Sequence, residues 1–245
     1  MSPRSRIPVL LSLFLIGAAA SANAASKLTS TDLRNGEQHL AELGFWTGPV
    51  DGVWDGASRQ ALIAFQKVQG ARPTGVLTRA ELNALSMATP LERHEAEMGP
   101  RIEVDIARQV LYVVGAEGEV GNIVPISSGS GRTFRENGYP ETRAVTPCGH
   151  LQVYAKAQGW KTSPLGQMHN PMYIVGGIAI HGSNDMRTYP ASHGCIRIPM
   201  FASERLTRMV PTGTRVVIFG CSEDGAAVVA GGETASSTAS AAAPR

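Results

Sequence analysis

IAIHGS at residues 178–183 and YPASHGCIRI at residues 189–198 are the two most informative segments of this sequence. Both contain β-branched apolar runs that strands favour, and both place His, Ser, Gly or Cys beside those runs. A free thiol has a pKa of about 8.5, so little of it is thiolate at neutral pH unless a base such as imidazole takes its proton. The two segments therefore predict a cysteine–histidine site held on neighbouring strands.

Cys195 is the candidate nucleophile of this site, and two histidines compete for the role of base. His193 is only two residues away and is constrained by the chain, whereas His181 ends an apolar strand and can approach from a neighbouring one, so we favour His181. Asp185 is the nearest carboxylate that could orient the imidazole, and a backbone carbonyl could do so instead. Gly194 allows close approach of the backbone, and the amides at 194 and 195 could point at a developing oxyanion.

The sequence around these segments alternates with a period of two, which is typical of strands. Residues 102–106 alternate clearly, and residues 109–114 follow as the expected hairpin partner. A helix is expected over residues 200–210, with Pro199 at its start. Further strands are expected at residues 120–127, 150–156, 172–180 and 214–219. This part of the chain therefore predicts a mostly β domain.

Residues 30–87 show helical spacing instead. A first helix is expected from an apolar face closed by a glycine stop: Leu33, Leu40, Leu43 and Gly44. Asp55 can cap a second helix, and Thr78 with Glu81 has the spacing of a capping box that opens a third. This region therefore predicts a small three-helix domain.

The formal charge of the 245-residue chain is +2, and Arg4 and Arg6 account for that excess. A chain without further net positive charge is a poor candidate for binding nucleic acid through its phosphates. The 43% of hydrophobic residues is enough for one large domain or two small ones with real cores. Nucleic acid is therefore not an expected partner.

Residues 1–24 are typical of a secretory signal peptide. Arg4 and Arg6 give a positive start, residues 9–20 form an apolar run of 12 residues, and ANA at residues 22–24 is a small-x-small cleavage site. The apolar run is too short to span a bilayer of about 30 Å as a helix. We therefore expect an exported protein of the periplasm, cell wall or extracellular space, with no stable membrane span after signal removal. An uncleaved N-terminal anchor is the alternative.

The order of these residues resembles the catalytic domain of the L,D-transpeptidase family. His-Gly at residues 181–182, then Ser-His-Gly-Cys at residues 192–195 with an apolar residue and Arg197 behind it, is the specific part of a resemblance that runs from about residue 101 to 219. Two further segments fit the family: TPCG at residues 146–149 and HNPM at residues 169–172.

The helical region resembles the peptidoglycan-binding domain that is often joined to such enzymes, through GPVDG at residues 48–52 and ALIAFQ at residues 61–66. If that domain is only an anchor, deletion of residues 30–87 should weaken binding to the sacculus and spare the turnover of a soluble substrate.

The resemblance implies a mostly β catalytic domain with a β-sandwich-like fold, preceded by the three-helix domain. It implies Cys195 as the nucleophile and His181 as the general base and acid. Ser192, His193 and Gly194 would shape the loop and the oxyanion hole. No metal or other cofactor is implied.

The reaction implied is attack on the L-to-D peptide bond before the terminal D-Ala of a peptidoglycan tetrapeptide stem. D-Ala leaves, an acyl-thioester forms on Cys195, and an amine of a neighbouring stem or protein resolves it into a cross-link, as in cell-wall biogenesis and control of cell shape. Arg197 would position a substrate carboxylate. The implied partners are the stem peptides and the glycan, and the implied inhibitors are carbapenems.

Three cysteines in an exported chain suggest one pair and one free thiol. With Cys195 as the nucleophile, Cys148 and Cys221 are left to form a disulfide. The expected organisation is a signal peptide at 1–24, a peptidoglycan-binding-like domain at 28–88, a linker at 89–99, the catalytic domain at 100–221 and a disordered tail at 222–245.

Several alternatives stay open on the sequence alone. Water in place of the amine would make the protein an L,D-carboxypeptidase. A degenerate site would leave a non-enzymatic peptidoglycan-binding protein, and a broader site would make a general thiol hydrolase. A zinc site would draw on four side chains whose spacing matches no standard closed site: His169, His181, His193 and Cys195. The oligomeric state is not predicted.

Overall fold

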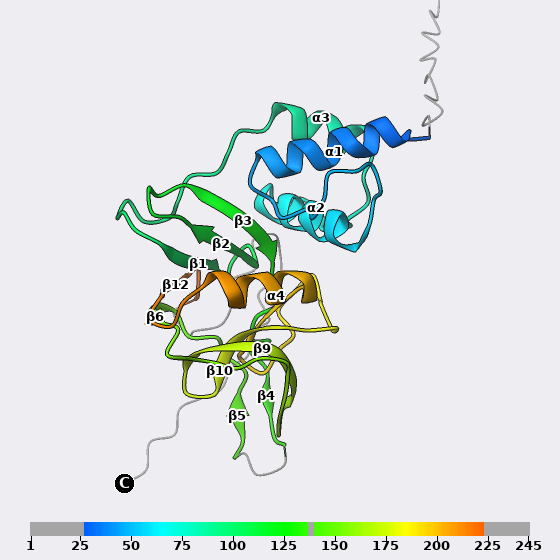
Figure 1. Cartoon of the computed structure of the whole chain (residues 1–245). Helices are drawn as coiled ribbons and strands as arrows, with labels where there is room; N and C mark the ends of the chain where they lie inside the picture. The colour runs from blue at the N-terminus through cyan, green and yellow to red at the C-terminus, as the bar shows by residue number, and fades with distance from the viewer. Residues whose placement is uncertain (1–26, 137–139, 223–245) are drawn as a thin grey trace, which may run out of the picture.

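The computed structural model describes residues 27–136 and 140–222, and Figure 1 shows their arrangement. Three helices lie together at one end of the molecule, and the short hairpin β4–β5 lies at the other end. The signal peptide expected at residues 1–24 lies outside the described residues, as does the expected tail from residue 223 onward. In the part of the chain that is described, no helix is both long and apolar enough to cross a membrane.

The helices are α1 (Ser30–Glu42), α2 (Gly56–Val68), α3 (Arg79–Met87) and α4 (Met200–Met209). The strands are β1 (Arg101–Asp105), β2 (Val110–Val114), β3 (Val120–Pro125), β4 (Thr133–Phe134), β5 (Thr142–Arg143), β6 (Gly149–Gln152), β7 (Ala155–Lys156), β8 (Trp160–Ser163), β9 (Gly166–Val175), β10 (Ile178–Gly182), β11 (Ile196–Ile198) and β12 (Arg215–Phe219).

Two sheets form the larger domain. The first has the strand order β3-β2-β1-β12-β6, in which β1 and β2 form the predicted antiparallel hairpin and β1 pairs with β12 in parallel. The second has the order β11-β10-β9-β7, with β8 added on β9. In this sheet β10 and β11 are parallel, so the two segments that the sequence singled out lie on adjacent strands.

One apolar core joins the two sheets and helix α4. Ile102 of β1 and Val216 of β12 meet Ile180 of β10 and Ile196 of β11 in it, and Leu206 of α4 packs against the same cluster. The strands contribute mainly β-branched residues at alternate positions, which is what a half-buried sheet favours. The predicted mostly β, sandwich-like domain is confirmed.

Two of the predicted strands are each divided in the structure. The strand expected at residues 172–180 is the hairpin β9–β10, because Gly176 and Gly177 supply a two-residue connection and Gly176 has a positive φ of 50°. The strand expected at 150–156 is divided into β6 and β7, which belong to different sheets. The short strands β4, β5 and β8 lack a clear apolar alternation and were not predicted.

The smaller domain consists of α1, α2 and α3, of which α2 and α3 begin where the capping signals predict. Asp55 accepts hydrogen bonds from the N–H groups of Ala57 and Ser58, and Thr78 accepts from Glu81 N–H. Caps of this kind satisfy backbone donors that a helix leaves unpaired at its first turn. The predicted three-helix domain is therefore present, with the starts of α2 and α3 correctly placed.

The helical domain shares a core with the first sheet. Leu40 and Phe65 of the helices pack in one cluster with Tyr112 of β2 and Ile123 of β3. The loop after α1 also bonds to β3, with Trp46 N–H donating to Ile123 O at 3.0 Å. The helices therefore cover the edge of the first sheet, which differs from the separable anchor expected from the sequence.

The segment expected as a linker, residues 89–99, is fastened to the first sheet. The guanidinium of Arg101 is fully buried and donates to Glu103 and to the carbonyls of Glu95 and Glu97. Glu103 also accepts from His94 N–H at 2.7 Å. Because these bonds are buried and charge-assisted, they fix the path between the two domains.

Candidate functional site

Strand alternation explains why reactive side chains gather on one face of the second sheet. The register pairs Ile180 with Ile196 and His181 with Arg197. Paired residues of neighbouring strands point to the same face, so the isoleucines enter the core while the His and Arg side chains enter a cavity on the other face. Cys195 stands just before β11 and faces the same cavity.

This cavity has a volume of about 560 Å³, and we call it the thiol cavity. Its floor is formed by residues of β9, β10 and the loop that leads into β11. Its walls come from the hairpin β4–β5 and from the turn between β8 and β9. The side chains that line it include Phe134, His181, Asp185, Ser192, His193, Cys195 and Arg197. The structure thus brings the predicted site residues together.

His181 is held in one tautomer by the backbone. Its Nδ1 lies 2.9 Å from Gly182 O, and a carbonyl only accepts, so Nδ1 carries the hydrogen and Nε2 is left with its lone pair. The side chain is 4% exposed, and burial lowers the pKa of His181 to about 4. The imidazole is therefore neutral and able to accept a proton at neutral pH. A carbonyl, and not Asp185, is its orienting group.

The thiol of Cys195 is the free cysteine among the described residues. Burial raises the pKa of this thiol above its ordinary value, although an Ala179 backbone hydrogen bond and the charge of Arg197 act in the opposite direction. The sulfur lies 3.9 Å from Gly177 O, which is a long contact. Thiol and imidazole are therefore both neutral before any substrate arrives.

Hydrogen bonds of Ser192 hold the loop that precedes Cys195 in shape. Ser192 Oγ donates to Cys195 O at 2.6 Å and accepts from Gly194 N–H at 3.0 Å. The Gly194 N–H is therefore bonded within the loop. This geometry supports a role in shaping the loop, and not the donation to an oxyanion that the sequence suggested. Glycine is required at this position because φ is +138° and a Cβ would stand 2.9 Å from Val145 O.

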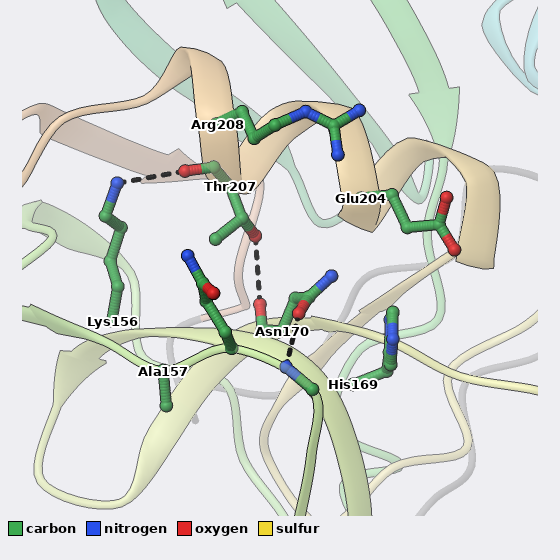
Figure 2. A pocket seen from close by; sticks show the side chains of 9 residues that line it. Lys156, Ala157, His169, Asn170, Glu204, Thr207 and Arg208 are labelled. Atoms are coloured by element: carbon green, nitrogen blue, oxygen red, sulfur yellow. Dashed lines mark hydrogen bonds between the residues drawn. The ribbon is translucent and has the colours of Figure 1, made fainter.

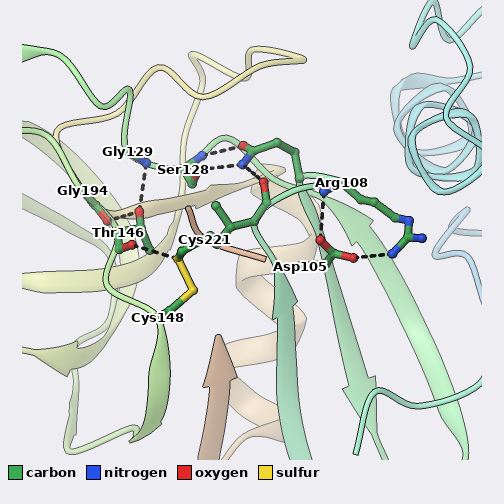
Figure 3. The surroundings of a disulfide bond; sticks show 10 residues. Asp105, Arg108, Ser128, Gly129, Thr146, Cys148, Gly194 and Cys221 are labelled. Carbon is green, nitrogen blue, oxygen red and sulfur yellow. Dashed lines mark hydrogen bonds and ion pairs between the residues drawn. A yellow bond between two sulfur atoms is a disulfide. The ribbon is translucent and has the colours of Figure 1, made fainter. Parts of the chain in front are cut away.

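Thr146 connects this loop to the predicted disulfide, as Figure 3 shows. Its Oγ1 donates to Gly194 O at 2.7 Å and accepts from Gly129 N–H at 2.9 Å. Two residues later, Cys148 is bonded to Cys221, with a Cα–Cα distance of 6.1 Å. Cys221 Sγ also packs 3.8 Å from Thr146 O. The disulfide therefore stands directly behind the segment that holds the loop of the nucleophile.

The contacts of His193 do not favour it as the base. Its Nε2 lies 3.2 Å from Glu136 Oε1, and its ring makes an edge contact with Phe134 at 4.7 Å between centroids. These partners belong to the hairpin β4–β5 and the residues that follow β4. His193 therefore links the loop of the nucleophile to one wall of the thiol cavity, which is consistent with the choice of His181 as the base.

Arg197 is mostly buried and has a carboxylate partner. One terminal nitrogen donates to Asp185 Oδ2 at 2.8 Å, while Arg187 binds the other oxygen of the same carboxylate at 2.6 Å. The cation of Arg197 acts on both reactive groups, since it lowers the pKa of His181 and of Cys195. It faces the cavity and carries the charge that a substrate carboxylate would need.

A second cavity, of about 740 Å³, lies between α4 and the strands β7 and β9, and Figure 2 shows it from close by. We call it the α4 seam. Lys156 Nζ donates to the carbonyls of Thr207 and Val210 at the end of α4, and Thr207 Oγ1 donates to Asn170 O. His169 Nδ1 lies 3.0 Å from Ser203 Oγ. These groups are thus occupied in docking α4 on the sheet.

The predicted zinc alternative has no geometric support in residues 27–136 and 140–222. Among these residues, no group of three or more His, Cys, Asp or Glu side chains is placed so that it could hold a metal ion. His169 is bound to α4 and His193 to Glu136, so the four side chains considered for zinc do not converge.

Some residues that shape the site are not identified by the sequence. Phe134 and Glu136 belong to a short polar hairpin without a strand pattern, and Gly177 is a turn residue. Their role depends on contacts between segments distant in the chain. The TPCG segment was the available signal for Thr146, and the structure shows what its hydroxyl holds.

Two family models match this chain. The model of the L,D-transpeptidase catalytic domain matches residues 99–218, and a model of a peptidoglycan binding domain matches residues 29–85. Among solved structures, the chain is similar to an L,D-transpeptidase from Xylanimonas cellulosilytica, with 37% identity and a TM-score of 0.71. That similarity covers 77% of this chain and 93% of the other.

A curated relative shares a smaller part. The chain is 38% identical over 69 residues to the localization factor PodJL of Caulobacter vibrioides. This match covers 28% of the present chain and 7% of the relative. The chain therefore spans a small fraction of the length of that relative.

Proposed function

Because this chain belongs to the L,D-transpeptidase family, we propose that it is an exported L,D-transpeptidase that cross-links peptidoglycan stems through a thioester on Cys195. In this proposal residues 1–24 direct export to the periplasm or cell wall and are removed. Residues 28–88 bind peptidoglycan, and residues 100–221 catalyse the reaction on a tetrapeptide stem.

The first step is acylation. Cys195 Sγ attacks the carbonyl carbon of the L-to-D bond before the terminal D-Ala, and the thiol proton passes to Nε2 of His181. The C–N bond then breaks, the same proton passes to the departing amine, and D-Ala leaves. The neutral thiol and neutral imidazole suit this sequence, because proton transfer accompanies attack and no charged pair has to be maintained in a buried site.

The second step resolves the thioester. An amine of a neighbouring stem attacks the acyl carbon, gives its proton to His181, and the sulfur departs and regains a proton. Arg197 receives a carboxylate of the stem in this proposal, while Asp185 holds the guanidinium in place. The closed loop of Ser192 and Gly194 fixes the sulfur against the floor of the cavity. Carbapenems would acylate the same thiol.

One observation supports this proposal most strongly. Cys195 is a free thiol, it faces the same cavity as His181, and the Nδ1 bond to Gly182 O leaves Nε2 of that imidazole free to accept the thiol proton. A degenerate fold that only binds peptidoglycan would have no need of this tautomer.

The test follows D-Ala release by mass spectrometry after the mature protein is mixed with a disaccharide-tetrapeptide. The proposal expects free D-Ala, a covalent acyl adduct on Cys195 and a cross-linked dimer, with none of the three in Cys195→Ala. D-Ala release without a dimer, even at high stem concentration, would indicate an L,D-carboxypeptidase. An intact substrate with the wild-type protein, or full activity of Cys195→Ala, would refute the proposal.

A further inference from the structure

Lys67 is a buried lysine that reaches from the helical domain into the catalytic domain. It lies in the last turn of α2 and is 7% exposed. Its Nζ donates to Ile126 O at 2.9 Å and to Gln109 O at 3.2 Å, so both acceptors belong to the first sheet and its connections. Burial lowers the pKa of Lys67 to about 7. A neutral amine still has two hydrogens, which is enough for both bonds.

The side chain of Gln109 connects the Lys67 contact to Ser128. Its Nε2 donates to Ser128 Oγ at 2.7 Å and to Ile106 O at 2.7 Å, and its Oε1 accepts from Ser128 N–H at 2.9 Å. Gln109 also has a positive φ of 58°, a conformation that is strained for a residue other than glycine. The bond from Lys67 to its carbonyl helps to hold it there.

Ser127 and Ser128 in turn hold the loop of the nucleophile. Ser128 O accepts from the N–H groups of Ala191 and Ser192, each at 2.9 Å. Ser127 exchanges two backbone hydrogen bonds with Arg197, each at 3.0 Å. The segment at 127–128 is thus bonded to the chain on both sides of Cys195.

We propose that Lys67 is a positioning residue, through which the helical domain fixes the segment 126–128 and thereby the loop that carries Cys195. The inference rests on the proposed function in one respect only, which is that Cys195 is the nucleophile. The helical domain then acts on catalysis as well as on binding, and its removal should impair turnover of a soluble substrate.

The test measures the rate at which iodoacetamide alkylates Cys195 in the full mature chain, with the disulfide intact. Lys67→Met keeps a long side chain but loses both bonds, so we expect kcat to fall by about tenfold with KM nearly unchanged. We also expect the alkylation rate to differ from that of the wild type by several-fold, because a loosened loop changes the exposure of the buried thiol. The matched control is Ser58→Ala. Ser58 is also a buried polar residue of α2, but its hydroxyl bonds to Glu37, within the helical domain. The control should stay within about twofold of the wild type.

A second variant approaches the same connection from the catalytic side. Gln109→Asn tolerates a positive φ but is too short to hold Ser128, so it should reproduce the loss while the helical domain is unchanged. This variant decides the matter if Lys67→Met does not fold. Wild-type alkylation rates in the folded Lys67→Met or Gln109→Asn protein, or an equal loss in Ser58→Ala, would overturn the inference. Alkylation needs no peptidoglycan, so failure of the proposed function would be seen separately.

Discussion

The two cavities beside strand β9 differ in how their polar groups are paired. In the α4 seam, Lys156 and His169 are bonded to α4 and help to dock it on the sheet. In the thiol cavity, burial lowers the pKa of His181 and raises that of Cys195. Both groups are thereby held neutral. Burial of titratable groups that face a cavity is therefore a better guide to chemistry than the presence of a cavity alone.

Removal of the base from the thiol cavity should have the largest effect on activity. His181→Asn keeps a side chain that can bond to Gly182 O but cannot accept the thiol proton, so kcat should fall by about 10²–10⁴-fold. His169→Asn in the α4 seam is the matched control and should retain most of the activity. D-Ala release is measured on both proteins. An equal loss of activity in His169→Asn would contradict the role of His181 as the base.

The acid side of the pH dependence of kcat/KM should report the lowered pKa of His181. The pKa of His181 is lowered to about 4, so the imidazole stays neutral and active down to that pH and becomes protonated and inactive below it. Activity should therefore fall about tenfold per unit below pH 4, and not from pH 6.5 as for an ordinary histidine. An acid limb near 6.5 would mean that the imidazole is not buried as described.

Loss of the disulfide should have a smaller effect on activity. Replacing Cys148 and Cys221 together by alanine frees the segment behind Thr146, whose hydroxyl holds Gly194 O. We expect unfolding free energy to fall by about 2–5 kcal/mol. We also expect kcat to fall by several-fold, because the loop of the nucleophile becomes less well placed. Urea titration and turnover of the folded protein measure the two effects. A change in stability without any change in kcat would separate the disulfide from the site.

The smallest effect is expected in the α4 seam itself. Arg208 lines that cavity with an exposed side chain, and Arg208→Ala should leave kcat/KM within about twofold of the wild type, as surface substitutions usually do. A loss of tenfold or more with an unchanged melting temperature would show that the α4 seam contributes to substrate binding, and that the two cavities do not differ in function as described.

The sequence predicts those parts of the molecule that depend on local pattern. Alternation locates β1 and β2, and caps locate the starts of α2 and α3. The spacing around His181 and Cys195 identifies a site that the fold brings together. The parts that depend on distant contacts could not be predicted. Lys67 is 42 residues from Gln109 and 59 from Ile126, and on the sequence it is one polar residue of a helix.

The corrections have the same physical origin. The Gly194 amide was expected to point at an oxyanion, and only the position of Ser192 Oγ shows that it is already bonded. The helical domain was expected to be separable, and only the packing of Phe65 with Ile123 shows that the two domains share a core.

Titration of the Cys195 thiolate by its ultraviolet absorbance shows whether Cys195 and His181 are both neutral at rest. The difference between wild type and Cys195→Ala isolates this one sulfur, since the other two are in the disulfide. With both groups neutral, the thiolate should form only above the ordinary thiol pKa of about 8.5, and His181→Asn should leave the titration nearly unchanged. A thiolate already present at about pH 6, and lost in His181→Asn, would show an ion pair and contradict the neutral resting state.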